Sequence, residues 1–375
     1  MDREQLRQLV ITEPNRDIAA AIKTHWDQIA KPLDSMGQFE LLTCRIGAIL
    51  EDETVDIGKK AVIVMCADNG IIAEGISQSG SEVTENVAAS MGRGTSSVCK
   101  MAAVVGADVI PVDIGMRCDK TPDGVRKERV VNGTKNFAKE PAMTEQEVLA
   151  AIEIGMDLVK ECKEQGYRLL ATGEMGIGNT TTSAAVAAAL TGWDPEVLTG
   201  RGAGLDDDGL SRKKQVIRKA LETYGLCRQG QTNPEEKSFS QTTPTQTSPE
   251  ETLRVLACVG GADLAGLAGV FLGGAFYHIP VVLDGLISGV AALAAESLVP
   301  GTKAYMVTSH ASREPAAGKV LELLGLEPVI RANLSLGEGT GAVMMFALLN
   351  EALAVYGNPT TFSDIQVQQY TRFDK

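Results

Sequence analysis

The segment YRLLATGEMGIGNTTTSAAVAAAL, residues 167–190, carries the pattern that decides the fold. YRLLAT (167–172) is a continuous apolar run, typical of a parallel strand that is covered on both faces. A glycine-rich turn follows it, and an Ala-rich helix is expected to begin near Asn179, because Asn and Thr are good N-cap residues. The segment therefore predicts one strand–turn–helix unit of an α/β protein.

Four further apolar runs of the same kind flank this unit. They are AVIVMC (61–66), ADVIPVDI (107–114), IPVVLD (279–284) and AYMVTS (304–309). Most are separated by segments of helical period, such as residues 144–165. This alternation predicts a Rossmann-like, doubly wound, mostly parallel α/β sheet, in which ligands bind at the carboxyl ends of the strands.

Three other segments have a distinct character. The first fifty residues read as amphipathic helices broken at Lys31-Pro32, with a restart near Ser35, where Ser35 and Gln38 resemble a capping box. Residues 264–283 are long and apolar enough to span a bilayer, but their glycines favour a buried helix followed by a strand. Residues 228–250 are polar and are expected to form a flexible surface loop.

Composition excludes several classes of protein. The chain has 375 residues, 44% of them hydrophobic, and a formal net charge of −13, which disfavours nucleic acid and anionic membranes as partners. Seven cysteines without C-x-x-C spacing argue against a disulfide framework or a structural zinc site. No apolar signal segment is visible near the start, so a cytoplasmic location is expected.

The glycine turn after the 167–172 strand predicts a phosphate site. A helix start behind glycines offers unpaired backbone N–H groups and the positive end of a dipole. Gly173, Gly176 and Gly178 do not have G-x-G-x-x-G spacing, and no P-loop lysine follows. An ordinary strand-to-helix turn is the plainer alternative. Glu174 would repel phosphate, so we expect it to contact another part of the ligand.

Two later glycine loops add charged groups. In TGRGAGLDDDGLSRKK (199–214), Lys213 or Lys214 could reach a phosphate at the first loop, with a solvated helix face as the alternative. In LGEGTGAVMMFALL (336–348), Glu338 lies between glycines just before an apolar helix. Such an acid can simply complement a helix dipole, but flanking glycines also let it project into a cleft as a general base.

Several co-ordered motifs resemble one family, the nicotinate-nucleotide–dimethylbenzimidazole phosphoribosyltransferases. They are KPLDSMGQFE (31–40), CADNGIIAEG (66–75), NGTKNFAKEPAMT (132–144), GEMGIGNTT (173–181), VGGADLAGLAG (259–269), VLDGLIS (282–288), SHASREP (309–315) and LGEGTGA (336–342). The resemblance covers roughly residues 20–355.

The resemblance implies a reaction and an architecture. The family moves phosphoribose from nicotinate mononucleotide to a benzimidazole nitrogen, giving α-ribazole phosphate and nicotinate, and its members are homodimers. The implied domains are a helical part of a small domain (1–55), a Rossmann-like catalytic domain (56–345, with 228–250 as a flexible insert) and the C-terminal part of the small domain (346–375). No cofactor and no metal is implied.

The resemblance also assigns roles to residues. The general base falls on Glu338 and a second acid on Glu174. The nucleotide phosphate would be held by backbone N–H groups around a short loop and by one lysine, which are Gly176, Ile177, Gly178, Asn179, Thr180 and Lys213. The pocket for the aromatic base would draw on Ser79, Val87 and Leu336.

The chain departs from relatives near that pocket. Val87 stands where some relatives carry Gln, Ser335 where some carry Arg, and Asn69 where His is common. A purine or a phenol is therefore an alternative acceptor, and a non-catalytic phosphonucleotide-binding paralogue is an alternative function. A dinucleotide-dependent oxidoreductase fits less well, because the glycine spacing is wrong and no acid ends a second strand about 20 residues further on.

Overall fold

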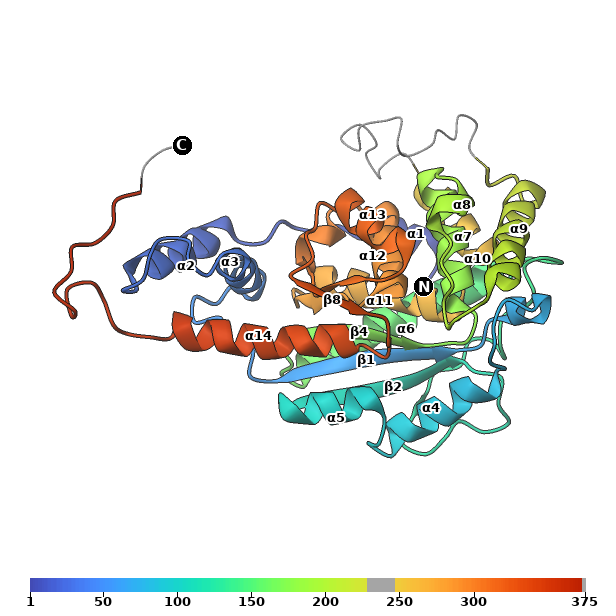
Figure 1. Cartoon of the computed structure of the whole chain (residues 1–375), viewed down its shortest axis with the longest axis horizontal. Helices are drawn as coiled ribbons and strands as arrows, with labels where there is room; N and C mark the ends of the chain where they lie inside the picture. The colour runs from blue at the N-terminus through green and yellow to red at the C-terminus, as the bar shows by residue number, and fades with distance from the viewer. Residues whose placement is uncertain (228–246, 373–375) are drawn as a thin grey trace.

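The computed structural model describes residues 1–227 and 247–372, and within them a six-stranded sheet forms the centre of the molecule (Figure 1). Its strands are β1 (Lys60–Ala67), β2 (Ala107–Gly115), β3 (Arg126–Lys127), β4 (Leu169–Met175), β5 (Val281–Val282) and β6 (Met306–Val307). All neighbours are parallel, in the order β3-β2-β1-β4-β5-β6. The predicted doubly wound fold is confirmed, and the strand order reverses between β1 and β4.

Both faces of the sheet are buried, as the continuous apolar runs predict. Along β1, Ala61, Ile63 and Met65 face one core cluster, whereas Val62 and Val64 face the other. Each of these side chains is inaccessible to solvent. Burial on both faces explains why the strand shows no alternation of polar and apolar residues.

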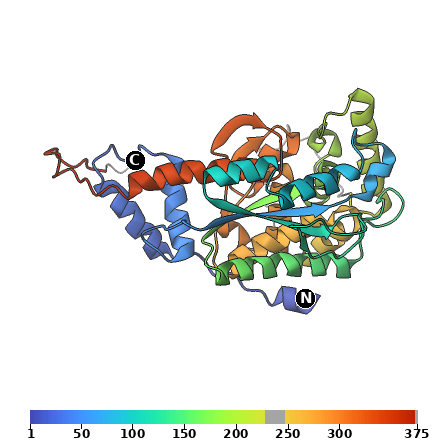
Figure 2. The same ribbon diagram turned by 90° about the horizontal axis from the view of Figure 1, so that it is seen from below.

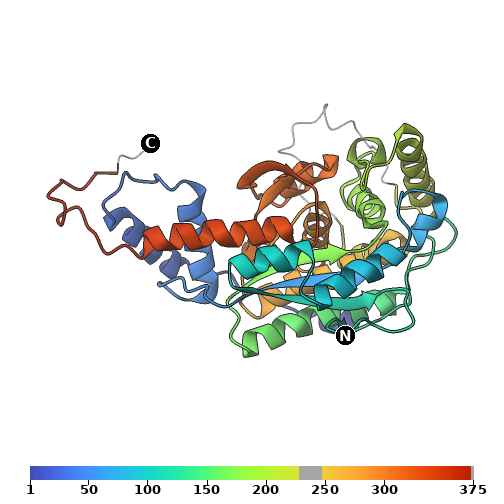
Figure 3. The ribbon, with the colours of Figure 1, turned by 60° about the horizontal axis from the view of Figure 1, so that its bottom comes forward.

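Helices cover the two faces. One face is covered mainly by α6 (Glu145–Glu164), α7 (Asn179–Thr191), α10 (Pro249–Val259), α11 (Ala262–Phe276), α12 (Leu286–Leu298) and α13 (Pro315–Leu323). The other is covered by α2 (Arg16–Gln28), α3 (Gln38–Leu50), α4 (Glu82–Gly92), α5 (Ser97–Val104) and α14 (Thr340–Tyr356). Figure 2 shows α14, α5 and α4 on one side of the sheet and α6 with α11 on the other, and Figure 3 shows α5 beside α14.

The remaining elements are short or peripheral. They are α1 (Arg3–Arg7), η1 (Gly70–Glu74), α8 (Pro195–Leu198), α9 (Asp207–Thr223), η4 (Thr302–Tyr305), and a small parallel sheet of β7 (His310–Ser312) and β8 (Ile330–Leu334). Both β7 and the turn after β8 contribute to the site described below.

The glycine-rich apolar segment is a buried helix, as predicted. Helix α11 packs so closely on α6 that a Cβ at Gly269 would lie 2.1 Å from the carbonyl oxygen of Ile152, and one at Gly155 would lie 2.2 Å from that of Gly266. Glycine is required where two helix backbones approach this closely. Across residues 1–227 and 247–372, no helix has the length and apolar character needed to cross a membrane.

Two predicted element boundaries are wrong. The strand that was expected to stop at Thr172 continues to Met175, because Glu174 and Met175 still pair with Met65 and Cys66 of β1. The capping box of Ser35 and Gln38 does not form. The N-cap of α3 is Gly37, which has a positive φ of 55° and no side chain that could cap the helix.

The structure describes only the last part of the polar segment 228–250, which was predicted to be a surface loop. Residues 228–246 lie outside the described part of the chain. Pro249 and Glu250 do not belong to a loop as predicted, because Ser248 caps α10 by accepting the N–H of Glu251 and the helix begins at Pro249. A Ser followed by Pro at the first helical position is a common helix start.

Segments near the two ends of the chain, but not the N-terminus itself, meet beside the sheet, where α2 and α3 lie near the far end of α14 (Figure 1). Ile29 and Thr361 form an antiparallel bridge, and the Ala30 N–H donates to the carbonyl oxygen of Thr360 at 3.0 Å. The bridge joins the two segments that the sequence assigns to a small domain, and that domain stays a prediction. The limits 1–55 and 346–375 themselves stay a prediction.

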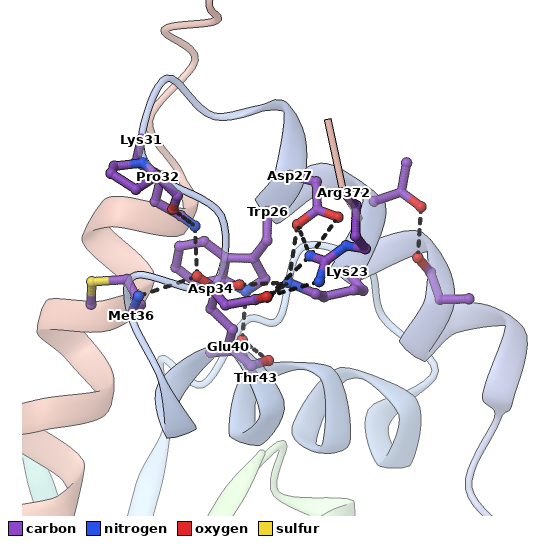
Figure 4. Close-up of polar contacts among 12 residues, drawn as sticks. Lys23, Trp26, Asp27, Lys31, Pro32, Asp34, Met36, Glu40, Thr43 and Arg372 are labelled. Atoms are coloured by element: carbon purple, nitrogen blue, oxygen red, sulfur yellow. Dashed lines mark hydrogen bonds and ion pairs between the residues drawn. The ribbon is translucent and has the colours of Figure 1, made fainter. Parts of the chain in front are cut away.

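An ion-pair network ties the C-terminal tail to this helix pair (Figure 4). Lys23 contacts Asp27 at 3.0 Å, Asp34 at 2.6 Å and Glu40 at 2.7 Å. Arg372 contacts Asp27 at 2.9 Å and Asp34 at 2.8 Å. The three carboxylates lie close enough together to hold a metal ion, but cationic side chains already neutralise them. We therefore interpret the cluster as a structural contact between the C-terminal tail and this helix pair.

Candidate active site

A cleft opens at the carboxyl ends of the central strands, near the switch point between β1 and β4. Its cavity volume is about 210 Å³. It is lined by parts of five segments, which fall within residues 174–180, 202–203, 284–288, 310–314 and 335–338. The three glycine loops singled out from the sequence therefore meet in one cleft, at the position where doubly wound sheets bind their ligands.

The first glycine loop ends at a helix start without a side-chain cap. Gly178, with a φ of 95°, occupies the N-cap of α7, so the cap is not Asn or Thr as expected. Two of the loop's N–H groups are engaged within the protein, since Ile177 donates to Thr84 Oγ1 at 3.2 Å and Asn179 to the Gly176 carbonyl at 3.1 Å. An anion would therefore meet the other N–H groups of this loop.

Lys213 reaches this loop from α9. Its Nζ donates to Thr180 Oγ1 at 2.8 Å, and the side chain is inaccessible to solvent. Burial lowers the pKa of Lys213 to about 8, whereas the nearby Glu314 carboxylate acts to raise it. Lys214 instead pairs with Glu196 at 2.6 Å. The alternative of a solvated helix face therefore does not apply to Lys213.

Glu314 links the second glycine loop to the cleft. Its Oε1 accepts the N–H of Gly202 at 3.1 Å. A Cβ at Gly202 would lie 2.6 Å from Thr180 Oγ1 and 3.3 Å from Lys213 Nζ, so this loop packs directly on the lysine and its partner. The carboxylate thus holds the backbone that surrounds the buried cation.

Glu174 lies at the end of β4 and accepts a hydrogen bond from the Asn179 side-chain amide. Burial raises the pKa of Glu174 to about 8, and the Asp263 and Asp284 carboxylates add to the rise. Burial also raises the pKa of Asp263, at the start of α11, to about 6. At neutral pH, Glu174 is therefore mainly protonated in the unliganded protein.

Glu338 projects from a strained loop. Its φ is 61°, between Gly337 at 83° and Gly339 at 91°. The Oε2 atom accepts the N–H of Val98, in the first turn of α5, at 3.2 Å. A Cβ at Gly337 would lie 2.7 Å from Glu174 Oε1, so the loop packs against the second acid. The structure thus brings Glu174 and Glu338, which are far apart in sequence, into one cleft.

Comparison with known proteins decides the family. The phosphoribosyltransferase family model matches residues 11–367. A nicotinate-nucleotide–dimethylbenzimidazole phosphoribosyltransferase of Acetivibrio thermocellus is 41% identical over 349 residues, 93% of each chain. That of Ruminiclostridium cellulolyticum is 37% identical over 360 residues, 96% of each. The chain belongs to this family of phosphoribosyltransferases.

Solved structures agree with that assignment. The crystal structure of CobT from Thermus thermophilus superposes with a TM-score of 0.83 at 35% identity, over 94% of this chain and all of the other. A structure of the nicotinate-nucleotide–dimethylbenzimidazole phosphoribosyltransferase from the same organism gives a TM-score of 0.82 at 34% identity, over 95% of this chain. The resemblance stated from the motifs is confirmed, and the chain is a transferase.

The residues expected to hold the aromatic base are not all brought together. Leu336 lines the cleft and is 56% exposed. Ser79 lies in the turn before α4, outside the cleft lining, and its N–H donates to Ser77 Oγ at 3.2 Å. Val87 packs against the core cluster under α4. Ser79 is close in sequence to a second, smaller hollow that shares loop 176–180 with the cleft and is also lined by Ile76, Ser77 and Gln78.

Four lining or neighbouring residues escaped prediction, namely Asp263, Asp284, His310 and Glu314. Two signals were present in the sequence. Asp263 is an acid at the start of an otherwise apolar helix, and Asp284 ends the apolar run 279–284. His310 lies in β7 and Glu314 is the N-cap of α13; both belong to the SHASREP motif of the resemblance, which was not used to assign them a role.

Proposed function

We propose that this phosphoribosyltransferase moves phosphoribose from nicotinate mononucleotide to 5,6-dimethylbenzimidazole or a related base. The observation that carries the proposal is one cleft whose lining joins the start of α7, at Thr180, to a pair of acids, with the buried Lys213 bonded to Thr180 from α9. Lys213 and Thr180 fit a phosphate, because a charge-assisted contact and a helix N-terminus both favour an anion. Glu174 and Glu338 fit the reacting rings.

The reaction is a single displacement at C1′. A nitrogen of the acceptor attacks C1′, the bond from C1′ to the pyridinium nitrogen breaks, and its electron pair neutralises the departing nicotinate ring. Glu338 accepts the proton that the acceptor's other nitrogen loses, which is typically worth 10²–10⁴-fold in rate for a general base. Attack from the face opposite nicotinate converts the β-nucleotide into an α-product, α-ribazole 5′-phosphate.

The electrostatics of the cleft suit this donor. Its pyridinium ring carries a positive charge, and the two acids Glu174 and Glu338 line the cleft. A cation placed there would lower the raised pKa of Glu174 by attraction to the ionised carboxylate. Much of the remaining acceleration should come from holding donor and acceptor side by side in one cleft.

The acceptor is the least constrained part of the proposal. Val87 and Ser335 stand where the resemblance implies Gln and Arg in some relatives, and Ser335 lines the cleft. A purine or a phenol is therefore a second candidate acceptor. A homodimeric state and a cytoplasmic location stay predictions.

Product analysis tests the proposal. The protein is incubated with nicotinate mononucleotide and, in separate arms, with dimethylbenzimidazole, adenine or a phenol. We expect nicotinate and an α-configured product in equal amounts, read by chromatography and by the anomeric proton resonance. Release of nicotinate only with adenine or a phenol would assign another acceptor. Binding of the nucleotide without turnover in any arm would indicate a non-catalytic paralogue, and a β-configured product would contradict the single displacement.

A further inference from the structure

The backbone that carries Glu338 needs support from elsewhere in the fold. A residue other than glycine held at positive φ, here 61°, is strained and persists only where the surroundings enforce it. The helix that follows, α14, has Gly339 at its N-cap, which has no side chain to bond the first N–H groups. The backbone of Glu338 and the first turn of α14 therefore both need a partner from another segment of the chain.

Asp284 meets that need from the turn after β5. Its Oδ1 accepts the N–H of Gly341 at 2.9 Å and the N–H of Ala342 at 3.2 Å. The two other N–H groups of the first turn are bonded locally, since Thr340 donates to the Gly337 carbonyl and Val343 to that of Gly339. Asp284 thus acts as the missing cap of α14, from a position 57 residues away in sequence.

The environment of Asp284 fixes its orientation. The side chain is only 6% exposed. Its backbone N–H donates to Ser288 Oγ at 3.1 Å, and its Oδ1 lies 3.9 Å from His310 Nδ1. The imidazole in turn fills the space beside Gly341, where a Cβ would lie 2.0 Å from Nδ1. The helix start is therefore held by a carboxylate on one side and by a buried ring on the other.

We propose that Asp284 is a positioning residue for Glu338. By bonding the first turn of α14, it holds the strained loop that carries Glu338, a residue of the cleft lining. This inference rests on the proposed function, in which Glu338 is the base. Misplacement of a reacting group by about 1 Å can cost on the order of 10²-fold in rate. Loss of the hydrogen bonds from α14 to Asp284 is therefore expected to lower kcat.

Asp284→Ala is expected to lower kcat about 10- to 100-fold while the KM for nicotinate mononucleotide stays within about threefold. Asp284→Asn, which retains an oxygen that can accept both N–H groups, should restore kcat to within about threefold of wild type. Asp284→Ser, whose shorter side chain cannot bridge both groups, replaces the alanine variant if the latter is not soluble.

A double-mutant cycle separates positioning from general destabilisation. If Asp284 acts through Glu338, adding Asp284→Ala to Glu338→Gln should lower kcat by no more than about threefold further. Glu296→Ala is the matched control, because Glu296 is also buried and accepts two backbone N–H groups, from Gly301 at 3.2 Å and Lys303 at 2.9 Å. It should lower Tm but leave kcat unchanged.

The outcomes distinguish the positioning role of Asp284 from the assignment of Glu338 as the base. Full kcat in Asp284→Ala, additive effects in the double variant, or an Asp284→Asn enzyme as slow as Asp284→Ala would each overturn the positioning role. Wild-type kcat in Glu338→Gln alone would instead overturn the assignment of the base.

Discussion

Replacing Lys213 by alanine tests how the cleft holds its donor. Lys213 is inaccessible to solvent and donates to Thr180 Oγ1 at 2.8 Å. In the proposed complex its ammonium group turns to the 5′-phosphate and forms a charge-assisted hydrogen bond. Such a bond is worth about 1.5–3 kcal/mol, so Lys213→Ala should raise the KM for nicotinate mononucleotide about 10- to 150-fold.

The pH dependence follows from the lowered pKa of about 8. At pH 7 the protonated form of Lys213 exceeds the neutral form about tenfold, and at pH 9 the ratio is inverted. Because only the ammonium form attracts phosphate, the wild-type KM should rise about tenfold between these pH values. The variant has no such group, so its disadvantage should shrink by about the same factor.

The assay compares two donors on three enzymes. Nicotinate riboside lacks the phosphate, so Lys213→Ala should hardly change its kcat/KM, and the titration of Glu174 affects both donors alike. Lys214→Ala is the matched control on the same helix, because Lys214 pairs with Glu196 outside the cleft. Equal losses for riboside and nucleotide, or a KM ratio independent of pH, would refute the phosphate role of Lys213.

Two further predictions concern the fold. Burial raises the pKa of Glu174 to about 8, above its ordinary value in the unfolded chain. The folded state therefore binds more protons than the unfolded state, and the protein loses stability as the pH rises from the unfolded pKa toward the folded pKa. Between pH 5 and 7 the unfolding free energy of wild type should fall by about 2 kcal/mol more than that of Glu174→Gln, as measured by urea unfolding, and parallel curves would show that Glu174 is ionised throughout. Gly269→Ala places a Cβ 2.1 Å from the Ile152 carbonyl oxygen and should lower stability by about 1–3 kcal/mol or more, whereas an unchanged Tm would mean that α6 and α11 separate freely.

Much of the fold could be read from the sequence because both faces of the sheet are covered. The run at 61–66 is continuous and apolar, and it became the central strand β1. Helix α6 was equally legible, since Thr144 and Glu147 form a capping box before a long periodic segment. Boundaries failed where tertiary contacts decide them, as at β4, whose last residues stay in the sheet because they pair with β1.

Only part of the candidate site could be predicted from the sequence, because some of its contacts join distant segments. Gly178 in the first loop and the glycines beside Glu338 mark backbone conformations that are local and therefore visible in sequence. The contact of Asp284 with α14 and that of Glu314 with Gly202 join distant segments, so no local pattern reports them. Burial of Lys213 could not be told from solvation, since both place a lysine on an amphipathic helix.

The central claim is that Glu338 removes a proton from the acceptor during phosphoribosyl transfer, and Glu338→Gln tests it most directly. The amide keeps the size of the side chain and an oxygen that can accept the Val98 N–H, so the fold and donor binding should be retained. The measurement is steady-state release of nicotinate with saturating dimethylbenzimidazole, alongside Tm. We expect kcat at least ~10²-fold below wild type with the donor KM within about threefold. A kcat within a few-fold of wild type, in a folded variant, would contradict the account.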